Sequence, residues 1–127
     1  VERSRGLGDV YKRQGVGYFL NVHEGPQAIS KFNTVKLEDG MILSNEPGYY
    51  KKNKYGIRIE NLIYVRKNNK KLQFENLTLA PIDKDLIDFK LLSIEEKQYL
   101  YDYHKVVYSK LKNYLNFEEK IWLKNLF

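Results

Sequence analysis

The sequence predicts an α+β fold, with β-strands through most of residues 15–70 and helices in the last third of the chain. Two observations lead to this prediction. Apolar and polar residues alternate through 57–65, which is the period of a half-buried strand. Further on, two capping signatures each open a run of apolar residues at helical spacing. The change from a period of two to a period near 3.6 separates the β part from the helical part.

Turn-forming residues divide the β part into short strands. Residues 17–22 suit a first strand, and the Asp-Gly pair at 39–40 is typical of a hairpin turn. The short apolar strand 41–45 leaves that turn and ends before the Pro-Gly pair at 47–48, because proline has no backbone donor. A last strand is expected over 72–80, where Pro81 ends it.

The segment 57–65 is predicted to be one strand with two distinct faces. One face carries Ile57, Ile59, Asn61, Ile63 and Val65, and the other carries Arg58, Glu60, Leu62 and Tyr64. Glu60 therefore shares a face with Arg58, and a neighbouring guanidinium can hold a carboxylate ionised and oriented.

Two capping boxes predict where the helices begin. Ser93 is followed by Glu96, and Asn116 is followed by Glu119, at the spacing in which the N-cap and the third helical residue bond each other's backbone. The first helix is expected to carry Leu100, Tyr103, Val107, Leu111 and Tyr114, and the second Ile121, Trp122 and Leu123.

Composition limits the class of protein. The 127 residues suffice for one modest domain with its own core, and the absence of cysteine excludes disulfides and thiolate metal sites. No apolar run approaches the roughly 20 residues of a membrane span, so a soluble, cytoplasmic protein is expected. The net charge of +6 gathers in 51–54 and 66–71, which also contain turn formers. We interpret both as solvated loop tips, not as a nucleic-acid surface.

Three side chains are candidates for chemistry. His23 follows an apolar segment, and a lone histidine there is either structural or catalytic. Glu46 ends an apolar strand just before Pro47, as an exposed turn residue or as an inward-pointing ligand. Glu60 lies in a segment suited to burial, where a carboxylate needs a compensating charge. That charge is supplied either by Arg58 in an ion pair or by a metal, since hard divalent cations prefer oxygen ligands.

The order and spacing of these motifs resemble one family. The segments 15–26, 45–50 and 56–61 are similar to the C-terminal half of the catalytic domain of aminopeptidase P, a pita-bread metallopeptidase of family M24. The segments 77–83 and 101–104 resemble the extra C-terminal domain of its longer, cytosolic-type members. The resemblance extends from residue 15 to residue 127 and implies the C-terminal half of a pita-bread domain followed by a small extension with helices.

This resemblance implies a site for two divalent ions, commonly manganese, bound by two aspartates, one histidine and two glutamates. Glu46 and Glu60 match the two glutamate ligands. His23 resembles a histidine that contacts the substrate and stabilises the tetrahedral intermediate, Arg58 an arginine that supports the second glutamate, and Tyr50 a tyrosine that lines the site. The implied reaction is removal of an N-terminal residue that precedes proline, by a water that the two ions activate.

The sequence departs from the family pattern at its start. Gln14 stands where the family has its histidine ligand, and Asp9 lies too close to serve as either aspartate ligand. Residues 1–14 resemble translated adapter sequence, so we expect a non-native leader and a truncated protein. The expected organisation is therefore the leader 1–14, the C-terminal half of the catalytic domain over 15–70, and the extension, a strand and two helices, over 71–127.

The expected function is that of a fragment of a dinuclear-metal Xaa-Pro aminopeptidase, and the chain as written is expected to be inactive. Its expected partner is a peptide with proline at the second position, with no nucleic acid and no membrane. A homodimer through the C-terminal extension is a further possibility that the resemblance raises. The alternative function is a non-catalytic pita-bread module that binds a peptide or a protein partner.

Overall fold

The computed structural model describes residues 14–17, 24–30 and 32–126. The chain divides into two compact units, Val1–Thr78 and Leu79–Phe127. The predicted helix-bearing extension over 71–127 stays a prediction, because the strand that opens it belongs to the first of these units.

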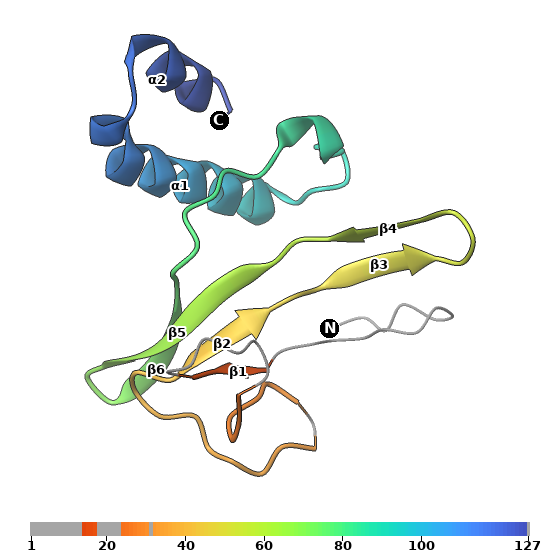
Figure 1. Cartoon of the computed structure of the whole chain (residues 1–127), viewed down its shortest axis with the longest axis vertical. Helices are drawn as coiled ribbons and strands as arrows, with labels where there is room; N and C mark the ends of the chain where they lie inside the picture. Colours follow the sequence, from red (N-terminus) through yellow and green to blue (C-terminus); the bar gives the residue numbers. More distant parts are fainter. Residues whose placement is uncertain (1–13, 18–23, 31, 127) are drawn as a thin grey trace. The chain divides into compact units, whose positions relative to one another are not determined.

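The first unit consists of two antiparallel sheets (Figure 1). The four-stranded sheet has the order β1-β2-β5-β6, and the two-stranded sheet pairs β3 with β4. The strands are β1 (Gly15–Val16), β2 (Ile42–Asn45), β3 (Gly48–Lys51), β4 (Tyr55–Arg58), β5 (Asn61–Asn68) and β6 (Lys71–Asn76).

The two sheets share one register. Asn45 of β2 pairs with Asn61 of β5, and Gly48 of β3 pairs with Arg58 of β4. Two residues therefore separate the ladders on each side, and no residue is gained or lost between them. β2 continues into β3, and β4 continues into β5, as the two arms of one long hairpin (Figure 1). Pro47 falls in the interruption, where it has no N–H to donate but still accepts from the N–H of Ile59 at 3.2 Å.

The core of this unit lies under the four-stranded sheet. Leu43, Ile63 and Val65 are buried and pack with the partly buried Ile29, Leu37 and Met41. The predicted alternation is confirmed in β5, where Ile63 and Val65 point inward and Leu62 is exposed. The expectation of one strand over 57–65 is wrong, because the ladder breaks at residues 59–60. Ile57 and Ile59 are each 48% exposed, because they lie on or beside the two-stranded part of the hairpin.

The ends of the other predicted strands differ from the expectation. The turn at 39–40 forms, with Gly40 at φ 85°, a conformation that favours glycine. The last strand ends at Asn76 and not at Ala80, because the backbone of Leu77 and Thr78 bonds the carbonyl of Leu62 outside the ladder. Of the strand predicted over 17–22, only residue 17 lies within the described residues.

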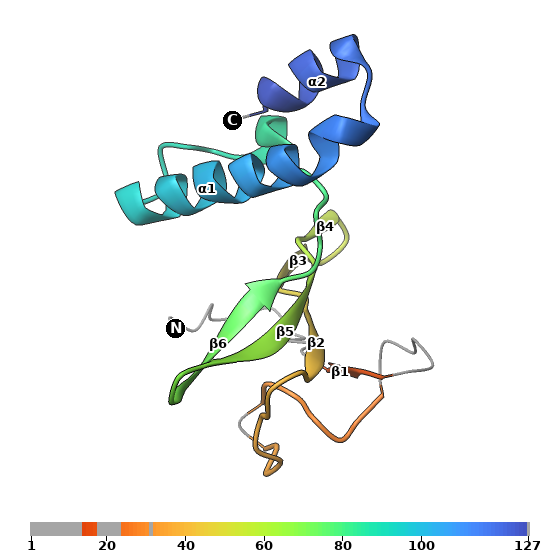
Figure 2. The same ribbon diagram turned by 90° about the vertical axis from the view of Figure 1, so that its left-hand side faces the viewer.

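The second unit is helical (Figure 2). Its elements are the 3₁₀ turn η1 (Lys84–Leu86), the helix α1 (Ile94–Leu111), the 3₁₀ turn η2 (Lys112–Tyr114) and the helix α2 (Phe117–Lys124). Both predicted capping boxes are confirmed. The Ser93 hydroxyl accepts from the N–H of Glu96 while the Glu96 carboxylate accepts from the N–H of Ser93, and Asn116 and Glu119 repeat the exchange. These boxes satisfy N–H groups that the first turn of a helix leaves unpaired.

Tyr103, Val107 and Leu123 form the buried core of the helical unit, and Tyr103 and Val107 lie on the predicted face of α1. The expectation for Tyr114 is wrong: α1 ends at Leu111, the chain tightens into η2, and Tyr114 is 85% exposed. In the described part of the chain, no helix is both long enough and apolar enough to cross a membrane.

Candidate metal-binding site

Glu46 is a buried carboxylate, with only 4% of its surface exposed. It follows β2, whose Leu43 and Ser44 are fully buried, so the strand brings the carboxylate to the inner part of the sheet. The Ser44 hydroxyl donates a hydrogen bond of 2.6 Å to Oε1 of Glu46. A buried carboxylate needs such donors because burial removes its hydration. The structure therefore excludes an exposed turn residue and shows an inward-pointing carboxylate, while the role of Glu46 as a ligand stays a prediction.

Glu60 lies opposite Glu46 in the hairpin. The shared register places both glutamates in the interruption between the two ladders, one on each arm. The Glu60 side chain is 38% exposed, so the expectation that its segment is suited to burial is wrong. The reason is local: β5 begins only at Asn61, and residue 60 lies in the gap before the four-stranded sheet.

Arg58 links the two carboxylates. Its Nη1 lies 3.5 Å from Oε2 of Glu46, and its Nη2 lies 3.4 Å from Oε2 of Glu60. The prediction that Arg58 lies beside Glu60 is confirmed. The contact between Arg58 and Glu46 was not predicted from the sequence. Both distances exceed those of short charge-assisted hydrogen bonds. The guanidinium therefore stands between the carboxylates and offsets their mutual repulsion without a bidentate bond to either.

The start of the described chain runs beside this site. The Gln14 carbonyl accepts from the N–H of Ser44 at 2.9 Å, and the Gln14 N–H donates to the Ser44 hydroxyl at 3.4 Å. Gln14 is thus one strand away from the serine that bonds Glu46. The sequence analysis did not identify Ser44 as a partner of Glu46. The signal that could have identified it is its position two residues before Glu46, on the same face of the strand.

Tyr50 lies on the same arm of the hairpin as Glu46, in β3, and is 40% exposed. Its cross-strand partner is Gly56, and the next pair on that face is Gly48 with Arg58. Residues directly opposite each other in an antiparallel ladder share a face. Tyr50 and Arg58 therefore face the same side. His23, the remaining predicted site residue, lies outside the described residues.

The donor set fits a hard cation in part. The carboxylates of Glu46 and Glu60 both form ion pairs with the guanidinium of Arg58. Carboxylate oxygens are also the ligands that hard divalent ions prefer. Within residues 14–17, 24–30 and 32–126, however, no group of three or more His, Cys, Asp or Glu side chains could hold a metal ion. The described residues thus offer two carboxylates near each other, and their role as metal ligands stays a prediction.

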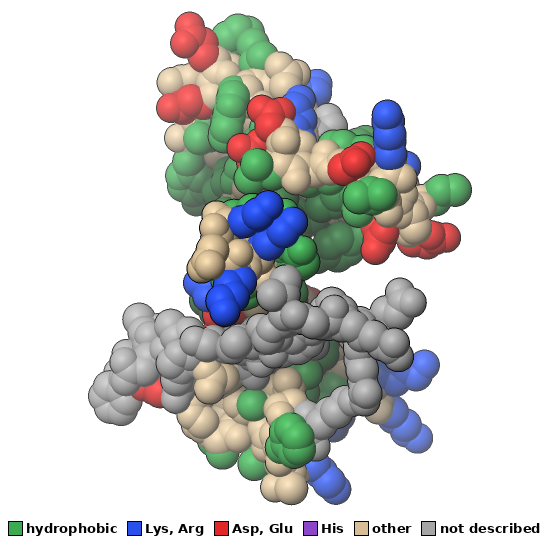
Figure 3. All heavy atoms as spheres, turned by 90° about the vertical axis from the view of Figure 1, so that its right-hand side faces the viewer, with side chains coloured by type: hydrophobic (Ala, Val, Ile, Leu, Met, Phe, Trp, Pro, Cys, Tyr) green, Lys and Arg blue, Asp and Glu red, His purple; other side chains and the backbone are tan. Residues whose placement is uncertain are grey.

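The lysine-rich turn between β3 and β4 projects into solvent. Lys51, Lys52 and Lys54 are exposed, and Figure 3, which looks onto this turn, shows lysine and arginine side chains gathered there. Exposure is what a solvated loop tip requires. The expectation that the turn does not bind nucleic acid stays a prediction.

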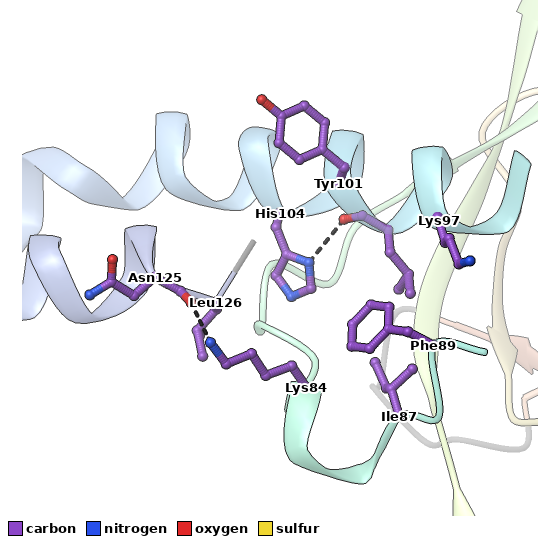
Figure 4. Close-up of a pocket in the computed structure, with 9 residues that line it drawn as sticks. Lys84, Ile87, Phe89, Lys97, Tyr101, His104, Asn125 and Leu126 are labelled. Carbon is purple, nitrogen blue, oxygen red and sulfur yellow. Dashed lines mark hydrogen bonds between the residues drawn. The ribbon is translucent and has the colours of Figure 1, made fainter. Parts of the chain in front are cut away.

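A separate pocket of about 260 Å³ lies within the helical unit (Figure 4). Phe89 and Ile87 lie on one side of it, and the buried His104 ring on another. Nε2 of His104 lies 3.1 Å from the backbone N and 3.2 Å from the carbonyl O of Ile82, and Nδ1 lies 2.9 Å from the carbonyl O of Leu100. With both ring nitrogens engaged by backbone, His104 ties the segment before η1 to α1. This is a structural role.

Two protein-family models match the chain. The metallopeptidase family M24 model matches residues 1–67, and the model of the C-terminal region of peptidase M24 matches residues 70–126. Together they cover both compact units.

Individual relatives agree with this match. The chain is 46% identical over 123 residues to a probable Xaa-Pro aminopeptidase P of Coprinopsis cinerea and 43% identical to one of Pyrenophora teres f. teres, covering 87% of this chain in each case. The crystal structure of the X-prolyl aminopeptidase of Caenorhabditis elegans, described as a cytosolic enzyme with a di-nuclear active site, matches with a TM-score of 0.80 at 38% identity over 91% of the chain. The predicted α+β, pita-bread fold is confirmed. The chain spans about a fifth of the length of these relatives.

Proposed function

Because this chain belongs to metallopeptidase family M24, we propose that it supplies Glu46 and Glu60 as two metal ligands of an Xaa-Pro aminopeptidase. The observation that supports this most is the pair of opposed carboxylates with Arg58 between them. The relatives named above as Xaa-Pro aminopeptidases, and the C. elegans enzyme with its di-nuclear site, support the reaction and the number of ions. Manganese is our proposal for the metal.

The chain's own residues then have distinct roles. The Ser44 hydroxyl fixes Oε1 of Glu46, and Oε2, which lies 3.5 Å from Nη1 of Arg58, is the oxygen that we propose binds a cation. Arg58 orients Glu60 and limits repulsion between the carboxylates. When bound, two divalent ions supply an activated water and polarise the scissile carbonyl. His23 and Tyr50 are proposed to contact the peptide, with His23 stabilising the tetrahedral intermediate.

The proposed substrate is a peptide with proline at its second position. A cytoplasmic location is supported by the cytosolic description of the C. elegans enzyme. The homodimer through residues 71–127 stays a proposal. So does inactivity of the 127 residues alone, which is supported by the absence of a cluster of three or more ligands in the described residues.

One observation favours the alternative of a non-catalytic binding module. Gln14 lies one strand away from Ser44 and Glu46, where the family resemblance implies a histidine ligand. A neutral amide oxygen is a weaker metal ligand than imidazole, so a protein that kept Gln14 would bind peptide without cleaving it.

A chimaera tests the proposed function. Residues 15–126 of this chain replace the matching segment of the C. elegans enzyme, and the resemblance implies that the retained part brings the two aspartates and the histidine. We expect the purified chimaera, loaded with Mn²⁺, to bind two ions and to hydrolyse an Xaa-Pro peptide. Installing Gln14 in the chimaera as well should abolish hydrolysis. A folded chimaera that binds two ions and the peptide without cleaving it would favour the module instead.

A further inference from the structure

Two glycines make room for the ring of Tyr50. A Cβ built on Gly48 would lie 2.7 Å from Cε2 of Tyr50, and one built on Gly56 would lie 2.5 Å from its Cδ1. Both distances are shorter than real Cβ contacts allow. Neither glycine has a positive φ, so other residues could adopt the backbone conformation at both positions. Glycine at both positions therefore lets the ring lie against the hairpin backbone, and a Cβ at either one would require the ring to move.

The register connects this arrangement to the glutamates. Gly56 is the cross-strand partner of Tyr50, and Gly48, two residues before Tyr50, pairs with Arg58. All four residues consequently share one face of the hairpin. Arg58 is in turn the residue that contacts both Glu46 and Glu60. The ring is thus held on the same face as the charge cluster, one residue pair away from Arg58.

The opposite face of the hairpin differs. Tyr49 and Tyr55 pack ring against ring there, with centroids 6.2 Å apart at 45°, and each is about half exposed. These two tyrosines support each other, whereas Tyr50 rests on glycines.

We propose that Gly48 and Gly56 are positioning residues that let the Tyr50 ring lie against the hairpin backbone beside Arg58, so that the peptide substrate meets the outward face of the ring. This inference rests on the proposed function. A methyl group at either glycine displaces the ring but removes no group that contacts the metal ions or the scissile bond. The loss should therefore fall on substrate binding and leave the chemical step largely intact.

The kinetic test uses the chimaera with Gly56→Ala and, separately, Gly48→Ala. We expect KM for an Xaa-Pro peptide to rise about 3- to 10-fold, the size of effect that follows from forcing a side chain out of its rotamer, while kcat changes less than about twofold. In a Tyr50→Ala background, Gly56→Ala should have no further effect on KM, as a double-mutant cycle requires of coupled residues. Tyr55→Ala, on the opposite face, is the control and should leave KM unchanged. An equal rise in KM with and without the Tyr50 ring would overturn the proposal.

A second measurement separates this inference from the proposed function. In NMR spectra of the 127-residue chain and of the glycine-labelled chimaera, ring currents from Tyr50 should shift the Hα resonances of Gly48 and Gly56 upfield. Tyr50→Ala should remove that shift. If the shift is present and the chimaera is inactive, the ring is seated as inferred and the proposed function fails. If the shift is absent from both proteins, the inference fails whatever the activity.

Discussion

The helix starts of one compact unit and the candidate site of the other depend on contacts of different range. In the helical unit, each capping box joins residues three apart, and the core comes from two neighbouring helices. In the β unit, the candidate site joins Arg58 to Glu46 across the hairpin, and Ser44 to Gln14, thirty residues away. The starts of the two helices are set by local signals, whereas the site exists only when distant strands adopt the correct register.

This difference predicts which changes affect activity and which affect only stability. Substitutions near the glutamates should reduce metal binding and hydrolysis, while substitutions in the helical core should reduce stability.

Glu46→Gln in the chimaera should reduce Xaa-Pro hydrolysis by at least about 10³-fold, because the loss of a direct ligand exceeds the 10- to 100-fold effect typical of outer partners. Initial rates and the metal content of the purified protein measure this. Glu118→Gln, an exposed glutamate in the first turn of α2, is the control. Retention of two ions and of full activity in Glu46→Gln would remove Glu46 from the ligand set.

Leu123→Ala should destabilise the helical unit by about 2–5 kcal/mol, the usual cost of truncating a buried leucine. Trp122 is the only tryptophan and lies in the same helix, so its fluorescence reports unfolding of this unit. Leu91→Ala, at a position 82% exposed, should change stability by less than about 0.5 kcal/mol. Equal destabilisation by both variants would mean that Leu123 is not part of a core.

Ser44→Ala in the chimaera should weaken metal affinity by about 10- to 100-fold, because it removes the donor that orients Glu46. Titration with Mn²⁺, followed by activity and by calorimetry, measures the change. Ser109→Ala, an exposed serine of α1, serves as the matched control. An unchanged affinity for Mn²⁺ in Ser44→Ala would show that the Ser44 hydroxyl does not orient Glu46 for metal binding.

The smallest predicted effect is a pH dependence in the helical unit. Burial raises the pKa of Tyr103, with a lesser contribution from Tyr99. Because the pKa of Tyr103 is raised in the folded state, the protonated hydroxyl contributes to the free energy of unfolding. That contribution is complete below the ordinary tyrosine pKa near 10. It is lost as the pH rises through the folded-state value.

Tyr103→Phe should therefore flatten the alkaline limb of the unfolding curve. It should also cost about 1 kcal/mol at neutral pH, through loss of the 2.6 Å hydrogen bond from the Tyr103 hydroxyl to the carbonyl of Ala80. Thermal unfolding between pH 7 and 11, followed by Trp122 fluorescence, tests both effects. An alkaline limb identical in the variant and the parent chain would contradict this account.

The range of contacts also explains how much could be predicted from the sequence. The capping boxes at Ser93 and Asn116 were predictable because their signal lies within four residues. The inward face of β5 was predictable because a strand has a period of two. The relative burial of the two glutamates was not predictable. Glu46 is buried by neighbouring strands, and the alternation of apolar and polar residues in its own strand does not reveal those neighbours. The bridging contact of Arg58 with Glu46 depends on register in the same way.

The most direct test of the central claim is anomalous diffraction from crystals of the chimaera grown with Mn²⁺. The account predicts two manganese peaks at one site, with the carboxylates of Glu46 and Glu60 both coordinating and Arg58 adjacent to them. Two ions bound without either glutamate, or a site that takes up no manganese when both glutamates are intact, would contradict it.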